Sequence, residues 1–203
     1  MSALSVQDFT TEASMATVRS IRFVTVLAVA LLGGFIVLAS GTSFGQEKYK
    51  ISYSTKAENT KYTFQHGLEI PDIPGHILRI VEIRVTWPDG GAPTIQGEKV
   101  VEAISRGMSD LIAGNGLAHG YTMWRFENGD QAFQQYEDSV QSVVNPDQSK
   151  KVTFVGTYVM TGGTGKLKGL KGVGRFSGFA DFNAEGKATR TAYSAEGEYW
   201  FEK

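Results

Sequence analysis

Residues 117–140 read LAHGYTMWRFENGDQAFQQYEDSV, and the fold class follows from this stretch. Side chains of different size and polarity alternate in steps of two on both sides of Asn128-Gly129, which is typical of strands whose two faces differ. Asn-Gly is the residue pair that best adopts the positive φ angles of a type I′ hairpin turn. The stretch therefore predicts two antiparallel strands, 117–127 and 131–143, joined by a tight turn.

The same pattern extends over the chain after Gln46, where no ten-residue segment sustains the i, i+3, i+4 apolar spacing of an amphipathic helix. Turn-forming residues separate the alternating segments, as at Asp89-Gly90-Gly91, Asn145-Pro146-Asp147 and 183–186. We therefore predict an all-β domain. Its expected strands are 48–56, 60–70, 76–87, 98–105, 117–127, 131–143, 151–160, 173–182 and 188–201.

The two faces of 117–125 indicate how the strands are arranged. One face carries Leu117, His119, Tyr121, Met123 and Arg125, and the other Ala118, Gly120, Thr122 and Trp124. Neither face is purely polar, which is typical of a small barrel whose interior holds some polar groups. We predict an antiparallel eight-stranded up-and-down barrel that closes to hide its edges. A β-sandwich is the alternative, although its core would give a cleaner apolar face.

The composition excludes several classes of protein. The chain has 203 residues, and its 20 basic and 21 acidic side chains leave a formal net charge of −1, so no nucleic-acid partner is expected. It has no cysteine, which excludes disulfides, thiolate metal sites and a cysteine nucleophile. Its three histidines lack the close spacing of metal ligands, so neither a metal nor a cofactor is expected.

An apolar run at 24–39, preceded by two arginines and followed by small residues, has the layout of a secretory signal peptide. We interpret 1–45 as this signal helix with an upstream extension, Met15 as the true initiator, and 46–203 as a single domain. Cleavage between the two segments would export the domain to the periplasm or outside the cell. The alternative is an uncleaved helix that anchors the chain to a membrane, although the run is slightly shorter than the roughly 20 residues that span a bilayer.

Residues 161–176 read TGGTGKLKGLKGVGRF and are rich in glycine. Their spacing does not fit a phosphate-binding loop, which needs Ser or Thr after the lysine at 166, nor a dinucleotide fingerprint, which needs a third glycine at a fixed distance. Glycines permit positive φ angles and close backbone approach, so we expect a wide turn between two strands. The residues assigned to this structural turn are Gly162, Gly163, Thr164, Gly165, Gly169, Gly172 and Gly174.

The segment from Thr161 to Lys166, followed by Gly169, Gly172 and Gly174 and by the final Gly197-Glu198-Tyr199, resembles the allene oxide cyclase barrel-like superfamily, which includes plant dirigent proteins. Similar small exported bacterial proteins carry the same segment. The resemblance implies an eight-stranded antiparallel barrel with a hydrophobic cavity, sometimes assembled into dimers or trimers. The plant enzymes cyclise a fatty-acid epoxide, and dirigent proteins steer the coupling of phenolic radicals. Because the matching residues form the turn and not the lumen, neither activity is transferred to this chain.

Polar side chains within the predicted strands are the candidates for chemistry. If the face of His119 lines the lumen, an imidazole, a phenol and a guanidinium point into one cavity. The predicted ligand-binding residues are therefore His119, Tyr121, Met123 and Arg125, and no catalytic residue is assigned. Glu82 and Arg84 are expected outside the barrel. Charges interpreted as hairpin and edge charges, which discourage edge pairing, are Glu127, Asp130, Glu137 and Asp138.

The leading hypothesis for function is an exported, non-catalytic barrel that binds a small, mostly apolar ligand in its lumen or self-associates into a homo-oligomer. One alternative is an isomerase or cyclase that acts on a lipid-like or phenolic substrate in the lumen, with His119, Tyr121 and Arg125 as candidate groups. The other is an envelope interaction protein without a pocket. An open apolar cavity would favour ligand binding, and convergence of His119 and Arg125 on that cavity would favour an enzyme.

Overall fold

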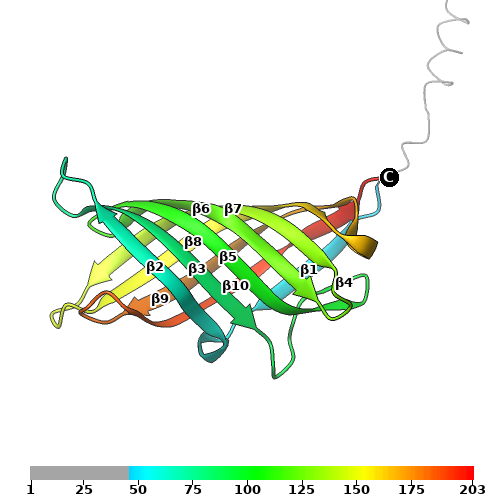
Figure 1. The fold of residues 1–203 in the computed structure, drawn as a ribbon, viewed down its shortest axis with the longest axis horizontal. Helices are drawn as coiled ribbons and strands as arrows, with labels where there is room; N and C mark the ends of the chain where they lie inside the picture. Colours follow the sequence, from blue (N-terminus) through cyan, green and yellow to red (C-terminus); the bar gives the residue numbers. More distant parts are fainter. Residues whose placement is uncertain (1–45) are drawn as a thin grey trace, which may run out of the picture. The chain divides into compact units, whose positions relative to one another are not determined.

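The computed structural model describes residues 46–203, which form one antiparallel sheet (Figure 1). The predicted signal helix and Met15 lie outside the described residues. Within 46–203 the helices are two single 3-10 turns, η1 (Ala57–Asn59) and η2 (Gly165–Leu167), and none has the length and apolar character to span a membrane. The strands are β1 (Tyr49–Ser54), β2 (Thr60–Glu69), β3 (His76–Thr86), β4 (Thr94–Ile95), β5 (Glu98–Ile112), β6 (Asn115–Phe126), β7 (Gln131–Val144), β8 (Lys150–Gly163), β9 (Leu170–Phe182) and β10 (Ala188–Phe201).

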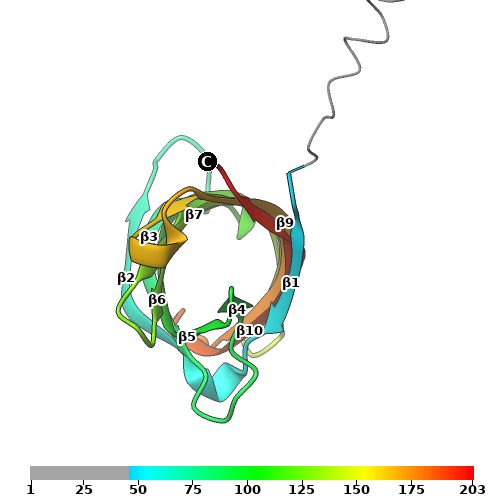
Figure 2. The same ribbon diagram turned by 90° about the vertical axis from the view of Figure 1, so that its right-hand side faces the viewer.

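Most strands pair with their neighbours in sequence. The order across the sheet is β1-β10-β9-β8-β7-β6-β5-β3-β2, and the short β4 pairs with the start of β5. The sheet rolls about a central axis, as the end view shows (Figure 2). The prediction of an all-β antiparallel domain is confirmed.

The closed eight-stranded barrel is not what the structure shows, because the sheet has ten strands and its end strands β1 and β2 do not pair in residues 46–203. The short length of β1 explains the opening. Its pairing with β10 stops at Ser54, and Thr55 then meets Tyr193 through a backbone N–H at 2.8 Å and a hydroxyl that accepts from the Tyr193 N–H at 2.9 Å. The chain leaves β10 at this point and turns through η1 into β2, so no strand pairs with the rest of β10 on that side.

The strand boundaries agree with the sequence prediction to within three residues, except around β5. That strand was expected over 98–105 and extends to Ile112, where Ala113 and Gly114 turn the chain with φ angles of 50° and 80°. Polar residues and a glycine interrupt the alternating pattern in the second half of β5, so the sequence does not predict this part of the strand. Ala-Gly is also a weaker hairpin signal than Asn-Gly. The two-residue β4 was not predicted, and a second tight turn with positive φ at Gln96 and Gly97 joins it to β5.

One end of the rolled sheet is packed with large side chains. Trp124, Phe126 and Ile95 are fully buried there, and the Tyr53 ring meets the Trp124 ring edge-on with centroids 5.3 Å apart. The connection between β3 and β5 folds inward with β4, where the Gln96 N–H donates to the Tyr199 hydroxyl at 3.2 Å. This end therefore forms the hydrophobic core of the domain.

The glycine-rich segment closes the same packed end. The turn itself spans 164–169, since β8 continues through Gly163 and β9 starts at Leu170. Gly165 and Gly169 adopt positive φ angles of 51° and 80°, as expected for a turn, and they allow Leu167 to be fully buried. The predicted turn therefore exists, but four of its assigned residues lie in the flanking strands: Gly162, Gly163, Gly172 and Gly174.

A row of residues in register runs around the interior of the rolled sheet and packs two tyrosines against glycines. From β5 to β10 this row, here called the glycine–tyrosine row, consists of Gly107, Gly120, Tyr136, Tyr158, Gly174 and Gly197. A Cβ at Gly120 would lie 2.6 Å from the Tyr136 hydroxyl, and one at Gly197 would lie 2.6 Å from the Tyr158 hydroxyl. Each tyrosine therefore occupies the space that two glycines leave free.

Replacing Gly107 by alanine tests this packing. The new Cβ would overlap the Tyr136 hydroxyl, so Gly107→Ala should lower the free energy of unfolding by about 2 kcal/mol. In a Tyr136→Phe background the same change should cost less, because the overlapping atom is gone. Urea unfolding measures both differences. Gly67→Ala is the control, since its nearest neighbour is 3.4 Å away, and equal costs for Gly107→Ala in the two backgrounds would contradict the account.

His76 ties the turn between β2 and β3 to β5. Its Nδ1 lies 2.6 Å from Asp72 Oδ1, and its Nε2 lies 2.7 Å from Asp110 Oδ1. Carboxylates only accept hydrogen bonds, so both contacts are best made when both ring nitrogens carry protons. These contacts raise the pKa of His76, and the hydrogen bond from His76 lowers the pKa of Asp72.

The sign of the pH dependence follows from the raised pKa of His76. The stabilisation is fully present below the ordinary pKa of histidine and is lost as the pH rises through the higher value in the folded state. His76→Gln should therefore destabilise the protein at pH 6 by more than at pH 9, as measured by urea unfolding. His66→Gln, a change at an exposed histidine, serves as the control. A pH-independent effect of His76→Gln would contradict the stabilising contacts of a charged His76 with Asp72 and Asp110.

Candidate functional site

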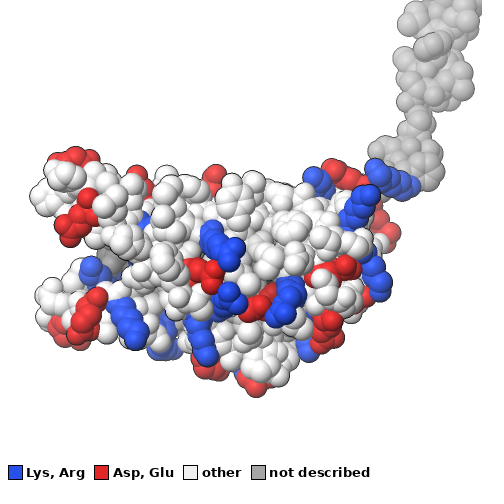
Figure 3. Space-filling model, viewed as in Figure 1, with Lys and Arg blue, Asp and Glu red and all other residues white. Residues whose placement is uncertain are grey.

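A cavity of about 150 Å³ lies inside the rolled sheet. It extends from the rings of Tyr136 and Tyr158 toward the end opposite the packed core, where Leu111, Val152 and Phe182 line it. Figure 3 shows that the molecular surface is indented at that end of the sheet. Residues from all the long strands line this cavity, so only the rolled sheet brings them together.

Aromatic rings form much of the cavity wall. Phe176 lies at the centre of this group, with its ring centroid 6.1 Å from that of Tyr136, 6.2 Å from that of Phe154 and 6.3 Å from that of Tyr193. Glycines on neighbouring strands make room for these rings, since a Cβ at Gly156 would lie 2.8 Å from the Phe176 ring. The wall is thus mostly apolar and rigidly packed.

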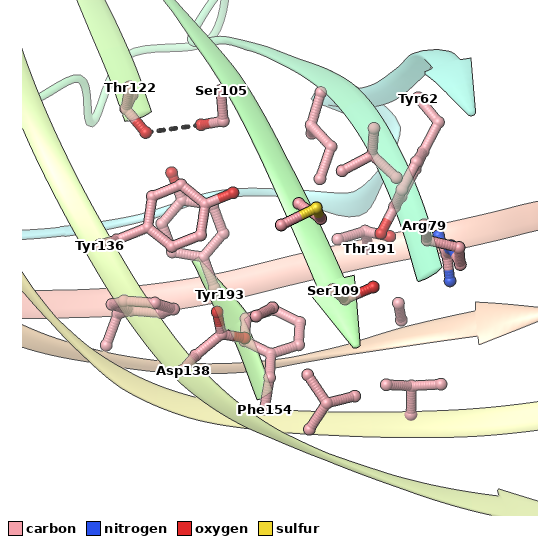
Figure 4. Close-up of a pocket in the computed structure, with 18 of the residues that line it drawn as sticks. Tyr62, Arg79, Ser105, Ser109, Thr122, Tyr136, Asp138, Phe154, Thr191 and Tyr193 are labelled. Atoms are coloured by element: carbon pink, nitrogen blue, oxygen red, sulfur yellow. Dashed lines mark hydrogen bonds between the residues drawn. The ribbon is translucent and has the colours of Figure 1, made fainter. Parts of the chain in front are cut away.

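Several polar side chains also face the cavity (Figure 4). Ser105 and Thr122 satisfy each other through a hydroxyl hydrogen bond of 2.8 Å. Other polar side-chain atoms in the wall are buried and form no hydrogen bond within residues 46–203. Buried polar atoms in native proteins are nearly always paired. These unpaired atoms in the cavity wall are Arg79 Nε, Gln134 Nε2, Asp138 Oδ1, Tyr158 OH and Thr191 Oγ1. The cavity wall therefore contains donors and acceptors that residues 46–203 leave unpaired.

Asp138 is the acidic group of the cavity. It lies on the inward face of β7, opposite Gly156 of β8 and Ala118 of β6. Burial raises its pKa to about 6, and no basic side chain opposes this effect. At neutral pH the carboxyl group is mostly ionised, and its burial therefore destabilises the folded state.

The cavity tyrosines stay neutral. Burial raises the pKa of Tyr158 and of Tyr193 to about 12, and it raises the pKa of Tyr136 further. Their hydroxyls therefore remain protonated and able to donate at physiological pH. Apart from Asp138, the charged group that lines the cavity is Arg79, whose guanidinium carbon lies 5.1 Å from the centre of the Phe182 ring.

Arg79 and Asp138 occupy separate parts of the cavity. They belong to one register row, in which Ser109 of β5 and Ala118 of β6 lie between them. Figure 4 shows Arg79 beside Tyr62 and Thr191, away from Asp138. The small side chains between the two charges leave space along the wall, so the cavity has an acidic part and a basic part.

The structure places His119, Tyr121 and Arg125 on the outer surface of β6, where Tyr121 is 63% exposed. The half-buried Met123 shares that face, so the lumen placement expected for this set is wrong. The inward face instead carries small residues and Trp124, because the narrow interior has no room for several long side chains. The ligand-binding role of His119, Tyr121, Met123 and Arg125 stays a prediction, now for the outside of the sheet.

Arg125 belongs to a network of ion pairs on the outer face. It donates to Glu102 at 3.0 Å, and Glu102 also accepts from Arg84 at 3.4 Å. Glu82 accepts hydrogen bonds from the Thr63 hydroxyl, from Arg106 and from Arg84, and these contacts lower its pKa to about 2. Acidic and basic groups alternate over this region in Figure 3. The expectation that Glu82 and Arg84 lie outside is therefore confirmed.

Asp138 was interpreted from the sequence as an edge charge, and this interpretation is wrong. Residues 137 and 138 point to opposite sides of β7, so Glu137 is exposed while Asp138 faces the cavity with Tyr136 and Val140. The two-residue alternation of β7 could have predicted this inward placement, because Asp138 shares its face with Ala132, Tyr136 and Val140. Arg79 was not considered as a site residue, although it alternates with Val81 and Ile83 in the same way.

The described part of the chain contains no group of three or more His, Asp or Glu side chains that could hold a metal ion. No protein-family model matches the chain, and it matches neither a curated protein nor a solved structure. The fold and the cavity define a small rolled β-sheet protein with an internal cavity. The likeness to the allene oxide cyclase barrel-like superfamily remains a proposal.

Replacing Asp138 by asparagine tests its electrostatic state. The raised pKa means that the folded state is favoured when Asp138 is protonated, and this advantage is lost as the pH rises through about 6. Asp138→Asn should therefore raise the free energy of unfolding at pH 8 by on the order of 1 kcal/mol and change it little at pH 4. Urea unfolding at both pH values measures this. Exposed Glu137→Gln is the control, and destabilisation by Asp138→Asn at pH 8 would contradict the assignment.

Proposed function

We propose that the protein is an exported, non-catalytic binding protein that holds one small, mostly apolar molecule inside its rolled sheet. The observation that carries the proposal is the internal cavity, whose wall combines aromatic rings with unpaired polar atoms. Ligand sites in proteins have this composition, since apolar walls supply affinity and a few polar groups fix orientation. Export is part of the proposal and rests on the signal-like sequence of 24–39.

The size of the cavity limits the ligand. A volume of about 150 Å³ holds roughly one benzene-sized ring, whereas pockets for drug-sized molecules measure about 300–1,000 Å³. A long fatty-acid chain does not fit without movement of the wall. We therefore propose a ligand with a single ring or a short branched chain, carrying one or two polar substituents that meet the unpaired atoms.

The lumenal enzyme is less well supported. Its candidate groups were His119, Tyr121 and Arg125, and these do not line the cavity. The polar groups that do line it include neutral tyrosines and a carboxylate, but they are dispersed around the wall without a hydrogen-bonded acid–base pair of the kind that moves protons. Self-association and an envelope interaction role are outcomes that the experiment below also detects.

Native mass spectrometry of the protein purified from its own host tests the proposal. We expect a bound mass of one small molecule per chain, released on unfolding. Ala118→Leu should abolish this mass, because Ala118 faces the cavity and the larger side chain fills it. Arg125→Ala should retain it. Loss of the mass in Arg125→Ala but not in Ala118→Leu would move the site to the outer face, and oligomers without bound mass would favour self-association.

A further inference from the structure

The carboxylate of Asp138 is the polar group in the cavity that most requires a partner. A carboxylate can only accept hydrogen bonds, and its Oδ1 accepts none from residues 46–203. Burying an ionised group without a partner is costly, so a positive group beside it would recover more free energy than any neutral contact. Nothing else in the wall supplies that charge, because Arg79 lies in a separate part of the cavity.

The surroundings of Asp138 are aromatic. A Cβ at Gly156 would touch both the Asp138 Cβ, at 2.6 Å, and the Phe176 ring, at 2.8 Å, so the carboxylate and this ring flank the same glycine. Tyr136 and Phe154 pack against Phe176 in edge-to-face and tilted contacts. An organic cation suits this place, because its apolar part can pack against the aromatic side chains and the carboxylate provides the counter-charge.

The other ionisable groups that face this space leave the negative charge of Asp138 unopposed. Tyr62 on β2, Tyr53 on β1, Tyr136 on β7, Tyr158 on β8 and Tyr193 on β10 all line the cavity, and burial raises the pKa of each of them. Arg79 on β3 is the basic group that lines the cavity. Its guanidinium lies over the Phe182 ring and interacts with Tyr62.

We propose that the cavity is selective for a small organic cation, an amine on a single ring or short chain, with its ammonium group at Asp138 and its apolar part against Phe154 and Phe176. This inference rests on the proposed function and specifies the chemical class of its ligand.

Isothermal titration calorimetry with three matched probes tests the charge. Benzylamine, benzyl alcohol and benzoate have similar size and differ in being cationic, neutral and anionic. At pH 7.5 we expect benzylamine to bind roughly tenfold or more tightly than benzyl alcohol, the factor given by one charge-assisted hydrogen bond. Asp138→Asn should remove this preference and leave the affinity for benzyl alcohol unchanged, whereas Glu137→Gln on the outer face should keep it.

The pH dependence provides an independent readout. Benzylamine stays cationic between pH 5 and pH 8, so its affinity should rise through about pH 6 as Asp138 ionises, and the affinity of benzyl alcohol should stay flat. Asp138→Asn should flatten the benzylamine profile. Equal affinities of the two probes, tighter binding of benzoate, or an unchanged preference in Asp138→Asn would overturn the inference while leaving a ligand cavity. Absence of binding by all three probes would overturn the proposed function as well.

Discussion

The narrow interior of the rolled sheet is the constraint on which the rest of the structure depends. Where adjacent strands place glycines opposite it, a tyrosine can lie close against the inner wall of the sheet. Tyr136 over Gly107 and Gly120, and Tyr158 over Gly174 and Gly197, satisfy this condition in one register row. A densely packed end supplies most of the hydrophobic stabilisation, and the cavity, which is lined by residues on both sides of this row, is the space that packing leaves unfilled.

The same constraint explains why the polar residues in the cavity are informative. In a wide lumen, water would satisfy a carboxylate or an amide, and their presence would need no explanation. Here Asp138, Gln134 and Thr191 have atoms that are buried and unpaired among the described residues. A small protein that retains such groups gives up stability, and functional sites are where proteins commonly do so. These unpaired groups therefore support the proposal that the cavity binds a ligand.

Most of the strand pattern could be predicted from the sequence, because two-residue alternation and Asn128-Gly129 act locally. The second half of β5 could not, since its polar residues and the Ala113-Gly114 turn resemble a loop. The inward face of β6 was also assigned wrongly. Alternation shows that the two faces of a strand differ, but it does not show which face points inside. The pairing of a tyrosine with a glycine on another strand can be recognised only once the register of the strands is known. Asp138 was misassigned for a related reason, as its exposed neighbour Glu137 suggested a charged surface pair.

The strand order also determines how the chain can fold. From β2 to β10 each strand pairs with the next long strand in sequence, so these contacts form by successive local hairpins. β1 differs, because Tyr49 pairs with Tyr199 near the other end of the chain. Closing so long a loop is entropically slow, and it cannot occur before β10 has been synthesised. β1 can therefore pair only after β10 has formed, and the domain completes its core, which includes Ile51 and Tyr53 of β1, at that late stage.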